Sequence, residues 1–90
     1  KKAFMYRKKN DELTEREVEG ELVILQGSTG DIHKLNQVAA CMWKELDQHF
    51  TPDRLVKRVT EQYAIDSKKA RQDVDQFLND MMALNLVEKI

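Results

Sequence analysis

The amino-acid sequence predicts an α+β domain, in which a three-stranded antiparallel N-terminal β-sheet is followed by three α-helices. Two observations carry this prediction. Apolar residues alternate or cluster in short runs up to Asn36, and beyond it they recur every three or four positions, which is the helical period. All three glycines lie in the first third of the chain, whereas the single proline, Pro52, lies in the second half. Ninety residues suffice for one small domain, expected over residues 11–90 after a basic tail at residues 1–10.

Three short runs before Asn36 predict the strands of the sheet. Turn-forming residues separate them, namely Glu19-Gly20 after the first run and residues 27–30 after the second. The second run is apolar at four successive positions, which is typical of a strand with both faces at least partly covered. We therefore expect the second strand at the centre of the sheet and the third at an edge. The predicted strands are Leu13–Val18, Glu21–Gln26 and Asp31–Leu35.

Three helices are predicted after the strands, each from a start signal and an apolar stripe. Asn36 and Thr51 are placed to cap the first two helices with a side-chain oxygen, Pro52 suits the first helical position, and the third helix opens at Asp66. A short extended piece closes the chain over residues 86–90. A small sheet with three such helices is a winged-helix-like arrangement. The stripes are Ala39, Met42, Trp43 and Leu46; Leu55, Val56, Val59 and Tyr63; and Ala70, Val74, Phe77, Leu78, Met81 and Leu84.

The residues that usually carry catalysis or bind metals are few and scattered. Cys41 is the only cysteine, and His33 and His49 lack metal-ligand spacing with it or with each other. No nucleophile and base are predicted to converge in a cleft, so we expect no enzyme, no bound cofactor and no metal. No apolar run approaches the roughly 18–20 residues that span a bilayer. We therefore expect a cytoplasmic protein with a reduced thiol and no membrane contact.

Charge is segregated along the chain although the net charge is only −1. Residues 1–10 carry five positive charges, and residues 11–31 carry seven negative charges and one positive charge. The predicted third helix begins with three basic residues at 68–71 and continues with three aspartates at 73–80, whose field repels a DNA duplex. DNA binding through a winged helix is disfavoured by this pattern but stays open as an alternative.

The predicted edge strand offers a different kind of interaction. An unpaired strand exposes amides and carbonyls that an extended peptide can join, with affinity from main-chain hydrogen bonds and specificity from side-chain pockets. If the third helix packs beside Asp31–Leu35, a groove forms between the strand and the flank of the helix. The expected floor residues are Phe77, Met81 and Leu84, and the expected flank residues are Lys69, Asp73, Gln76 and Asp80.

The pair Leu35-Asn36, followed by Trp43, Asp66 and the pair Asp73-Val74, occurs in an order that resembles the PqqD family, the pyrroloquinoline quinone biosynthesis protein D group. The similarity covers about residues 13–87. It implies a strand-strand-strand-helix-helix-helix domain known as the RiPP precursor-peptide recognition element. Such domains are peptide chaperones of natural product biosynthesis. They bind the leader of a ribosomally synthesised precursor peptide and present it to a modifying enzyme, often a radical S-adenosylmethionine enzyme.

The resemblance also implies where the peptide binds, because in this family the leader adds to the third strand and lies against the third helix. The implied partners are a leader peptide and a radical SAM or other peptide-modifying enzyme, without nucleic acid. A free edge strand allows a monomer or a dimer. A winged-helix DNA-binding protein and a general protein-interaction subunit remain as alternatives. The peptide-binding residues carried over by position are Asp31, Ile32, His33, Lys34, Leu35, Lys69, Arg71, Asp73, Gln76, Phe77 and Asp80.

Overall fold

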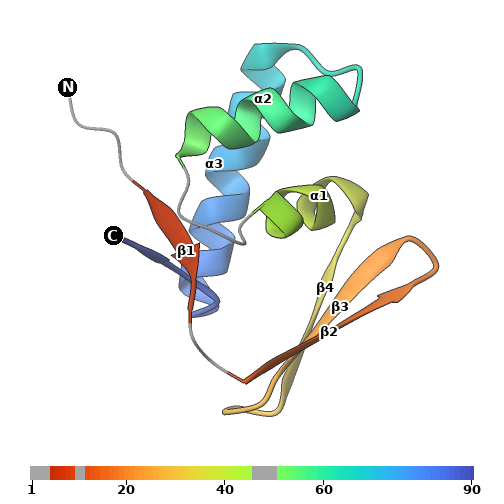
Figure 1. Ribbon diagram of the computed structural model, residues 1–90, viewed down its shortest axis with the longest axis vertical. Coiled ribbons are helices and arrows are strands. Elements are labelled where there is room, and N and C mark those ends of the chain that lie inside the picture. Colours follow the sequence, from red (N-terminus) through yellow and green to blue (C-terminus); the bar gives the residue numbers. More distant parts are fainter. Residues whose placement is uncertain (1–4, 10–11, 46–50) are drawn as a thin grey trace.

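The computed structural model describes residues 5–9, 12–45 and 51–90 and confirms the predicted fold class (Figure 1). A three-stranded antiparallel sheet precedes three helices, and a second sheet of two strands joins the ends of the chain. None of the helices in these ranges is long and apolar enough to cross a membrane. In chain order the elements are β1 (Tyr6–Lys8), β2 (Leu13–Val18), β3 (Glu21–Gln26), β4 (Asp31–Leu35), α1 (Gln37–Glu45), α2 (Pro52–Gln62), α3 (Ser67–Ala83) and β5 (Val87–Lys89).

The main sheet has the strand order β2-β3-β4, so β3 is central and β4 is an edge, as predicted. Glu19 and Gly20 form the turn between β2 and β3 and both have positive φ, at 52° and 82°. Positive φ at both central residues gives a two-residue turn whose twist matches that of the flanking strands, and glycine adopts it without steric cost. Local turn chemistry therefore sets the register of this hairpin.

The two faces of the main sheet have different surroundings. On the inner face Leu22 and Ile24 of β3 are buried in the core. On the outer face Leu25 pairs across the ladder with Ile32 of β4, and these side chains are 41% and 65% exposed. The core of the protein therefore lies on one side of the sheet only.

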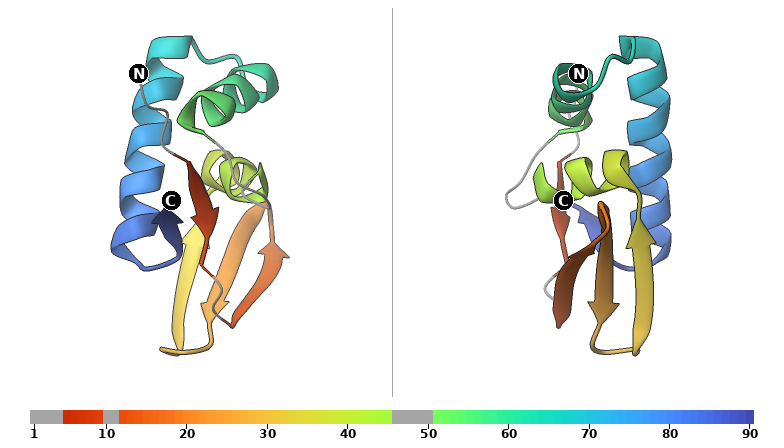
Figure 2. Two further views of the ribbon diagram at one scale, coloured as in Figure 1. Left: turned by 60° about the vertical axis from the view of Figure 1, so that its left-hand side comes forward. Right: turned by 90° about the vertical axis from the view of Figure 1, so that its right-hand side faces the viewer.

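α1 lies against one end of the main sheet, α2 lies beyond α1, and α3 runs beside them (Figure 2). α1 contacts β3, β4 and α2, while α3 contacts α2 and β5. Most stripe residues predicted from sequence are buried, whereas Ala39 and Tyr63 are partly buried and Leu84, just after α3, is 39% exposed. Leu46 and His49 lie outside the described residues. The largest fully buried side chains in the described part of the chain are Trp43, Ile24, Leu55, Leu86, Val59, Val74 and Val87.

The helix caps differ in how they are made. The Oδ1 of Asn36 accepts a hydrogen bond from the amide of Ala39 at 2.9 Å, and the Oδ1 of Asp66 accepts one from the amide of Lys69 at 2.8 Å. The prediction that the Thr51 hydroxyl caps α2 is wrong, because this side chain makes no cap hydrogen bond. The carbonyl oxygen of Thr51 accepts from the amide of Arg54 at 3.1 Å instead, so the hydroxyl is not needed there.

The N-terminal segment differs from the predicted tail. Residues 6–8 form β1, which pairs antiparallel with β5, and the Tyr6 side chain is 8% exposed within the core. The Nζ of Lys8 lies 4.6 Å from the ring centroid of Trp43, which adds a cation–π contact to α1. β5 confirms the extended piece expected at the end of the chain. Part of residues 1–10 is therefore integral to the fold.

The two cap residues of α2 and α3 provide a matched test of local stability. We expect Asp66→Ala to lower the free energy of unfolding by about 1 kcal/mol, because it leaves an orphan amide at the start of α3. Thr51→Ala is the control and should change stability much less, since its hydroxyl makes no cap bond. Urea unfolding followed by circular dichroism measures both changes. Equal losses in the two variants would contradict this assignment of the caps.

Candidate functional site

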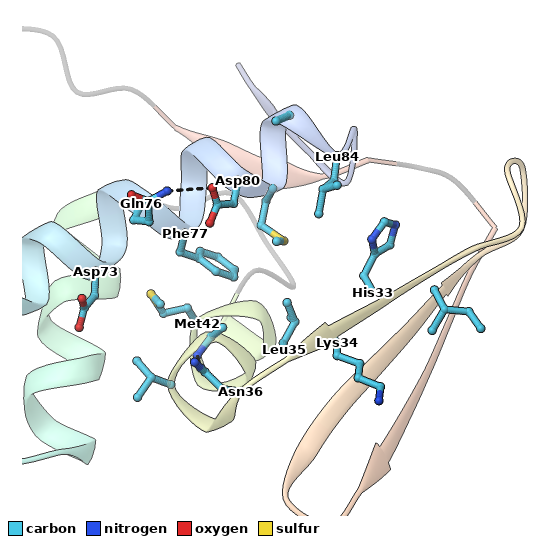
Figure 3. A pocket seen from close by; sticks show the side chains of 15 residues that line it. His33, Lys34, Leu35, Asn36, Met42, Asp73, Gln76, Phe77, Asp80 and Leu84 are labelled. Atoms are coloured by element: carbon cyan, nitrogen blue, oxygen red, sulfur yellow. Dashed lines mark hydrogen bonds between the residues drawn. The ribbon is translucent and has the colours of Figure 1, made fainter.

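A groove of about 760 Å³ opens between the free edge of β4 and the flank of α3, with α1 closing one side (Figure 3). We call it the β4–α3 groove. The strand, the first turns of α1 and the second half of α3 each contribute side chains, so three elements position the site. Its lining residues are Ile32, His33, Lys34, Leu35, Asn36, Val38, Ala39, Met42, Asp73, Gln76, Phe77, Asp80, Met81, Ala83 and Leu84.

The floor of the β4–α3 groove is apolar and rigidly held. Leu35, Met42, Phe77 and Met81 are each at most 5% exposed, so these core residues also line the groove. An apolar group entering the groove would therefore be removed from water without much rearrangement of the floor. Burial of one large aliphatic or aromatic side chain contributes roughly 1.5–3 kcal/mol.

The α3 wall of the groove is acidic. Asp73 forms an ion pair with Lys69 one turn earlier, at 3.0 Å between Oδ1 and Nζ. Asp80 accepts a hydrogen bond from the side-chain amide of Gln76 at 2.9 Å, and no cation within the described ranges pairs with it. The wall thus presents one neutralised carboxylate and one whose negative charge is not compensated by a neighbouring cation.

The β4 wall directs its side chains alternately to two sides, as strand geometry requires. His33 and Leu35 point toward the groove, whereas the side chain of Lys34 points away from α3 (Figure 3). The Nε2 of His33 donates to Oε1 of Gln26 at 3.0 Å, and Gln26 is 3% exposed. This hydrogen bond fixes the imidazole against β3, so the inner side of the β4 edge is preorganised.

Comparisons with known proteins bear on what such a groove does. A family model described as Coenzyme PQQ synthesis protein D (PqqD) matches residues 21–87. The chain belongs to the PqqD family. The matched range runs from the start of β3 to the start of β5 and includes all the lining residues of the groove. A search of curated proteins gave no match.

Two solved structures share the fold of this PqqD-family chain. One is TbiB1 in complex with the TbiA(beta) leader peptide, with 22% identity, a TM-score of 0.80, and coverage of 91% of this chain and 94% of that one. The other is lasso peptide synthetase B1 complexed with the leader peptide, with 19% identity, a TM-score of 0.78, and coverage of 92% and 96%. At these identities the likeness shows a common fold.

Most of the peptide-binding residues expected from the sequence line the groove, and three do not. Asp31 lies at the start of β4, outside the lining. Lys69 reaches the groove only through its ion pair with Asp73. Arg71 forms an ion pair with Asp53 of α2, so its charge is engaged away from the groove. The expected residues that do line it are Ile32, His33, Lys34, Leu35, Asp73, Gln76, Phe77 and Asp80, together with the expected floor residues Met81 and Leu84.

Sequence reasoning missed the contribution of α1 to the groove of this PqqD-family protein. Val38, Ala39 and Met42 line it, and Asn36 lies where β4 leads into α1. The apolar stripe predicted for this helix includes Ala39 and Met42 but not Val38, and it predicts only a face packed in the core. The signal that could have identified them is proximity in sequence, because α1 begins two residues after the expected edge strand ends and its first turn must lie at the end of that strand.

The opposite edge of the sheet, β2, carries ion pairs on its inner side. Glu15 of β2 lies 3.7 Å from the Nζ of Lys8, and Glu17 pairs with Lys44 of α1. Both glutamates lie opposite inward-facing residues of β3, so they occupy the inner side of the β2 edge. A strand added at β2 would meet these ion pairs, whereas a strand added at β4 meets the apolar floor of the groove.

A second cavity of about 290 Å³ lies near the β2 edge and is lined in part by Cys41. Burial raises the pKa of the Cys41 thiol, against the opposing effect of the nearby Arg58 guanidinium. A raised pKa keeps the sulfur protonated at neutral pH, and the protonated form is a poor nucleophile. Arg58 itself pairs with Glu45 at 2.6 Å. This cavity therefore offers no activated thiol.

The ion pairs also bear on the DNA-binding alternative. Two of the three basic residues at the start of α3 are paired: Lys69 with Asp73 of α3, and Arg71 with Asp53 of α2. Paired cations release fewer counterions when they approach phosphates, so they contribute less to affinity for nucleic acid. No observation at these positions favours a duplex over a peptide.

Proposed function

We propose that this PqqD-family chain is a peptide chaperone that binds the leader of a ribosomally synthesised precursor peptide by β-strand addition at the edge of β4. The observation that carries the proposal is the free edge of β4 directly beside the β4–α3 groove. The two structural neighbours, which are both complexes with leader peptides, support the same function for this fold.

Strand addition explains how one short groove would hold a flexible peptide. The main chain of the leader would pair with the exposed amides and carbonyls of β4, which supplies affinity independent of sequence. Every second side chain would then point toward Leu35, Phe77 and Met81, which supplies specificity. Ordering the leader costs conformational entropy that subtracts from this gain. A micromolar complex, equivalent to about −8.2 kcal/mol, is a reasonable expectation for such an interface.

The bound leader would be delivered to a separate modifying enzyme, a radical SAM enzyme or another peptide-modifying enzyme. In this proposal the chain has no catalytic residue of its own, and it acts by raising the effective concentration of the precursor at that enzyme. The raised pKa of Cys41 and the scattered positions of the histidines are consistent with a carrier. No cofactor is needed for this role.

Titration of the isotope-labelled protein with the leader peptide encoded beside its gene tests the proposal. We expect chemical-shift changes at the amides of β4 and of α3 between Asp73 and Ala83, because these elements border the groove. The amides of β2 are the internal control and should change little, because β2 is the other edge of the sheet and does not line the groove.

Two outcomes would contradict the proposal. Absence of binding at leader concentrations up to about 1 mM would exclude a useful affinity, since that value corresponds to only −4.1 kcal/mol. Changes concentrated at β2 would place the peptide at the wrong edge. A parallel titration with a DNA duplex at low and moderate salt tests the alternative, for which affinity should fall steeply with salt.

A further inference from the structure

Positive charge lies on the outer face of the sheet next to the β4 edge. The ladder aligns Arg16 of β2, Val23 of β3 and Lys34 of β4 in one row across the three strands. Neither Arg16 nor Lys34 forms an ion pair with any residue that the structure describes. The side chain of Lys34 points away from α3 (Figure 3). A strand added to β4 would place one of its outward side chains directly beside this ammonium group.

Negative charge lies on the other side of the same edge. Asp80 on the α3 wall lines the β4–α3 groove, and within the described part of the chain its side chain has only the neutral amide of Gln76 as a partner. The other carboxylate of the wall, Asp73, is already paired with Lys69. Beneath Asp80 the groove is apolar, so the aliphatic stem of a long cationic side chain could lie over Phe77 while its head reaches the carboxylate. The inner side of the edge therefore favours a cation.

A strand added at the β4 edge would have the positive charge of Lys34 beside its outer face and the negative charge of Asp80 beside its groove face. Successive side chains of a strand point to opposite faces, so a slip of one residue exchanges every groove-side and outer-side position. A peptide with a cation on the groove side and an anion on the outer side would match Asp80 and Lys34 in one register. After a one-residue slip the cation would lie on the outer face and the anion on the groove side, so neither charge pair could form.

We propose that the leader is recognised in a fixed register through opposite charges on its two faces: a lysine or arginine on the groove side pairs with Asp80, and an aspartate or glutamate on the outer side pairs with Lys34. This inference rests on the proposed function, because it requires strand addition at β4. It specifies a substrate class. The basic and acidic residues of the leader are separated by an odd number of positions, since only odd separations place two side chains on opposite faces.

Selection from a random dodecapeptide library against the intact protein tests the inference without knowledge of the natural leader. We expect enriched peptides to contain a basic and an acidic residue at odd separations more often than at even ones. The strongest binder is then synthesised together with a variant in which its basic and acidic residues are exchanged. The exchanged peptide should bind about tenfold more weakly, because both charge pairs are replaced by like-charge contacts.

Variants of the protein assign the effect to the two side chains. Asp80→Asn keeps an oxygen that can accept from Gln76 but removes the charge, and Lys34→Gln removes the charge on the outer face. Each should weaken the selected peptide about two- to fivefold, with a smaller effect at high salt. Asp75→Asn and Lys57→Gln are the matched controls, because both residues are exposed and do not line the groove. The double variant Lys34→Glu with Asp80→Lys should prefer the exchanged peptide.

The possible failures are distinguishable. If selected peptides shift the amides of β4 and α3 but show no odd-separation preference, or if Asp80→Asn and Lys34→Gln bind them unchanged, the charge-based register is wrong and strand addition stands. If no peptide is enriched, or if the enriched peptides leave the amides of β4 and α3 unaffected, strand addition at this groove is wrong, and the charge-based register is wrong with it.

Discussion

Replacing Trp43 with alanine is expected to lower the free energy of unfolding by about 3–5 kcal/mol. Trp43 is fully buried on α1, and α1 packs against β3, β4 and α2, so a cavity at this position would loosen the junction between sheet and helices. The variant also loses the cation–π contact that ties Lys8 of β1 to α1. Because a domain of this size has an unfolding free energy near the lower end of 5–15 kcal/mol, the loss would leave little stability.

Trp43→Phe is the companion variant that keeps the test informative if the alanine variant does not fold. The indole Nε1 is buried and has no hydrogen-bond partner among the residues that the structure describes, so the substitution by phenylalanine removes no hydrogen bond there. We expect a clearly smaller loss than for alanine. Urea unfolding followed by far-UV circular dichroism measures both variants without relying on tryptophan fluorescence. A loss below about 1 kcal/mol for alanine would contradict the central position assigned to this side chain.

The elements predicted from sequence with correct boundaries are those specified by local signals. The three strands of the main sheet follow one another through short turns, and the pair Glu19-Gly20 has the chemistry that a two-residue turn requires. Helix starts at Asn36 and Asp66 were visible because a capping side chain acts on an amide only three residues away. Such signals can be recognised without knowledge of the rest of the fold.

The strand β1 could not be recognised in this way. It has three residues, of which Tyr6 alone is deeply buried, and it lies in a segment dominated by lysine and arginine. Its partner β5 is at the opposite end of the chain, where Val87 pairs with Lys8. A pairing between residues almost eighty positions apart leaves no periodic pattern in either short segment, so the segment has the composition of a tail.

The residues of the candidate site likewise fall into two groups. Local sequence patterns predict the position of some, and the position of the others depends on tertiary packing. Lys69 and Asp73 are four residues apart on α3 and share a face, as their ion pair shows. Arg71 lies two residues from each of them, which places it on a different side of the helix, where it pairs with Asp53. Its assignment to the groove was carried over by position from the resemblance to the PqqD family, and the helical period did not enter into it. The part played by Ala39 depends on how α1 is rotated against the sheet, which the sequence pattern does not specify.

The orientation of α1 against the sheet makes this helix the element on which a substitution can block the groove without changing the acidic α3 wall. Ala39 is partly buried, lines the β4–α3 groove and is held at the start of α1 by the hydrogen bond from its amide to Asn36. We expect an indole introduced by Ala39→Trp to occupy space that an apolar side chain of the leader would otherwise fill. Loss of one such burial, worth roughly 1.5–3 kcal/mol, should weaken leader binding by about 10- to 150-fold.

Gln37→Trp is the matched control for this prediction. It adds the same side chain to the same helix only two residues earlier, but Gln37 lines the second cavity near Cys41 and not the groove. We expect the control to bind the leader as the unmodified protein does, while circular dichroism confirms that both variants are folded. Isothermal titration calorimetry with the leader measures the difference. Because the two variants differ only in the direction in which α1 presents the indole, equal affinities would show that the leader does not occupy the β4–α3 groove.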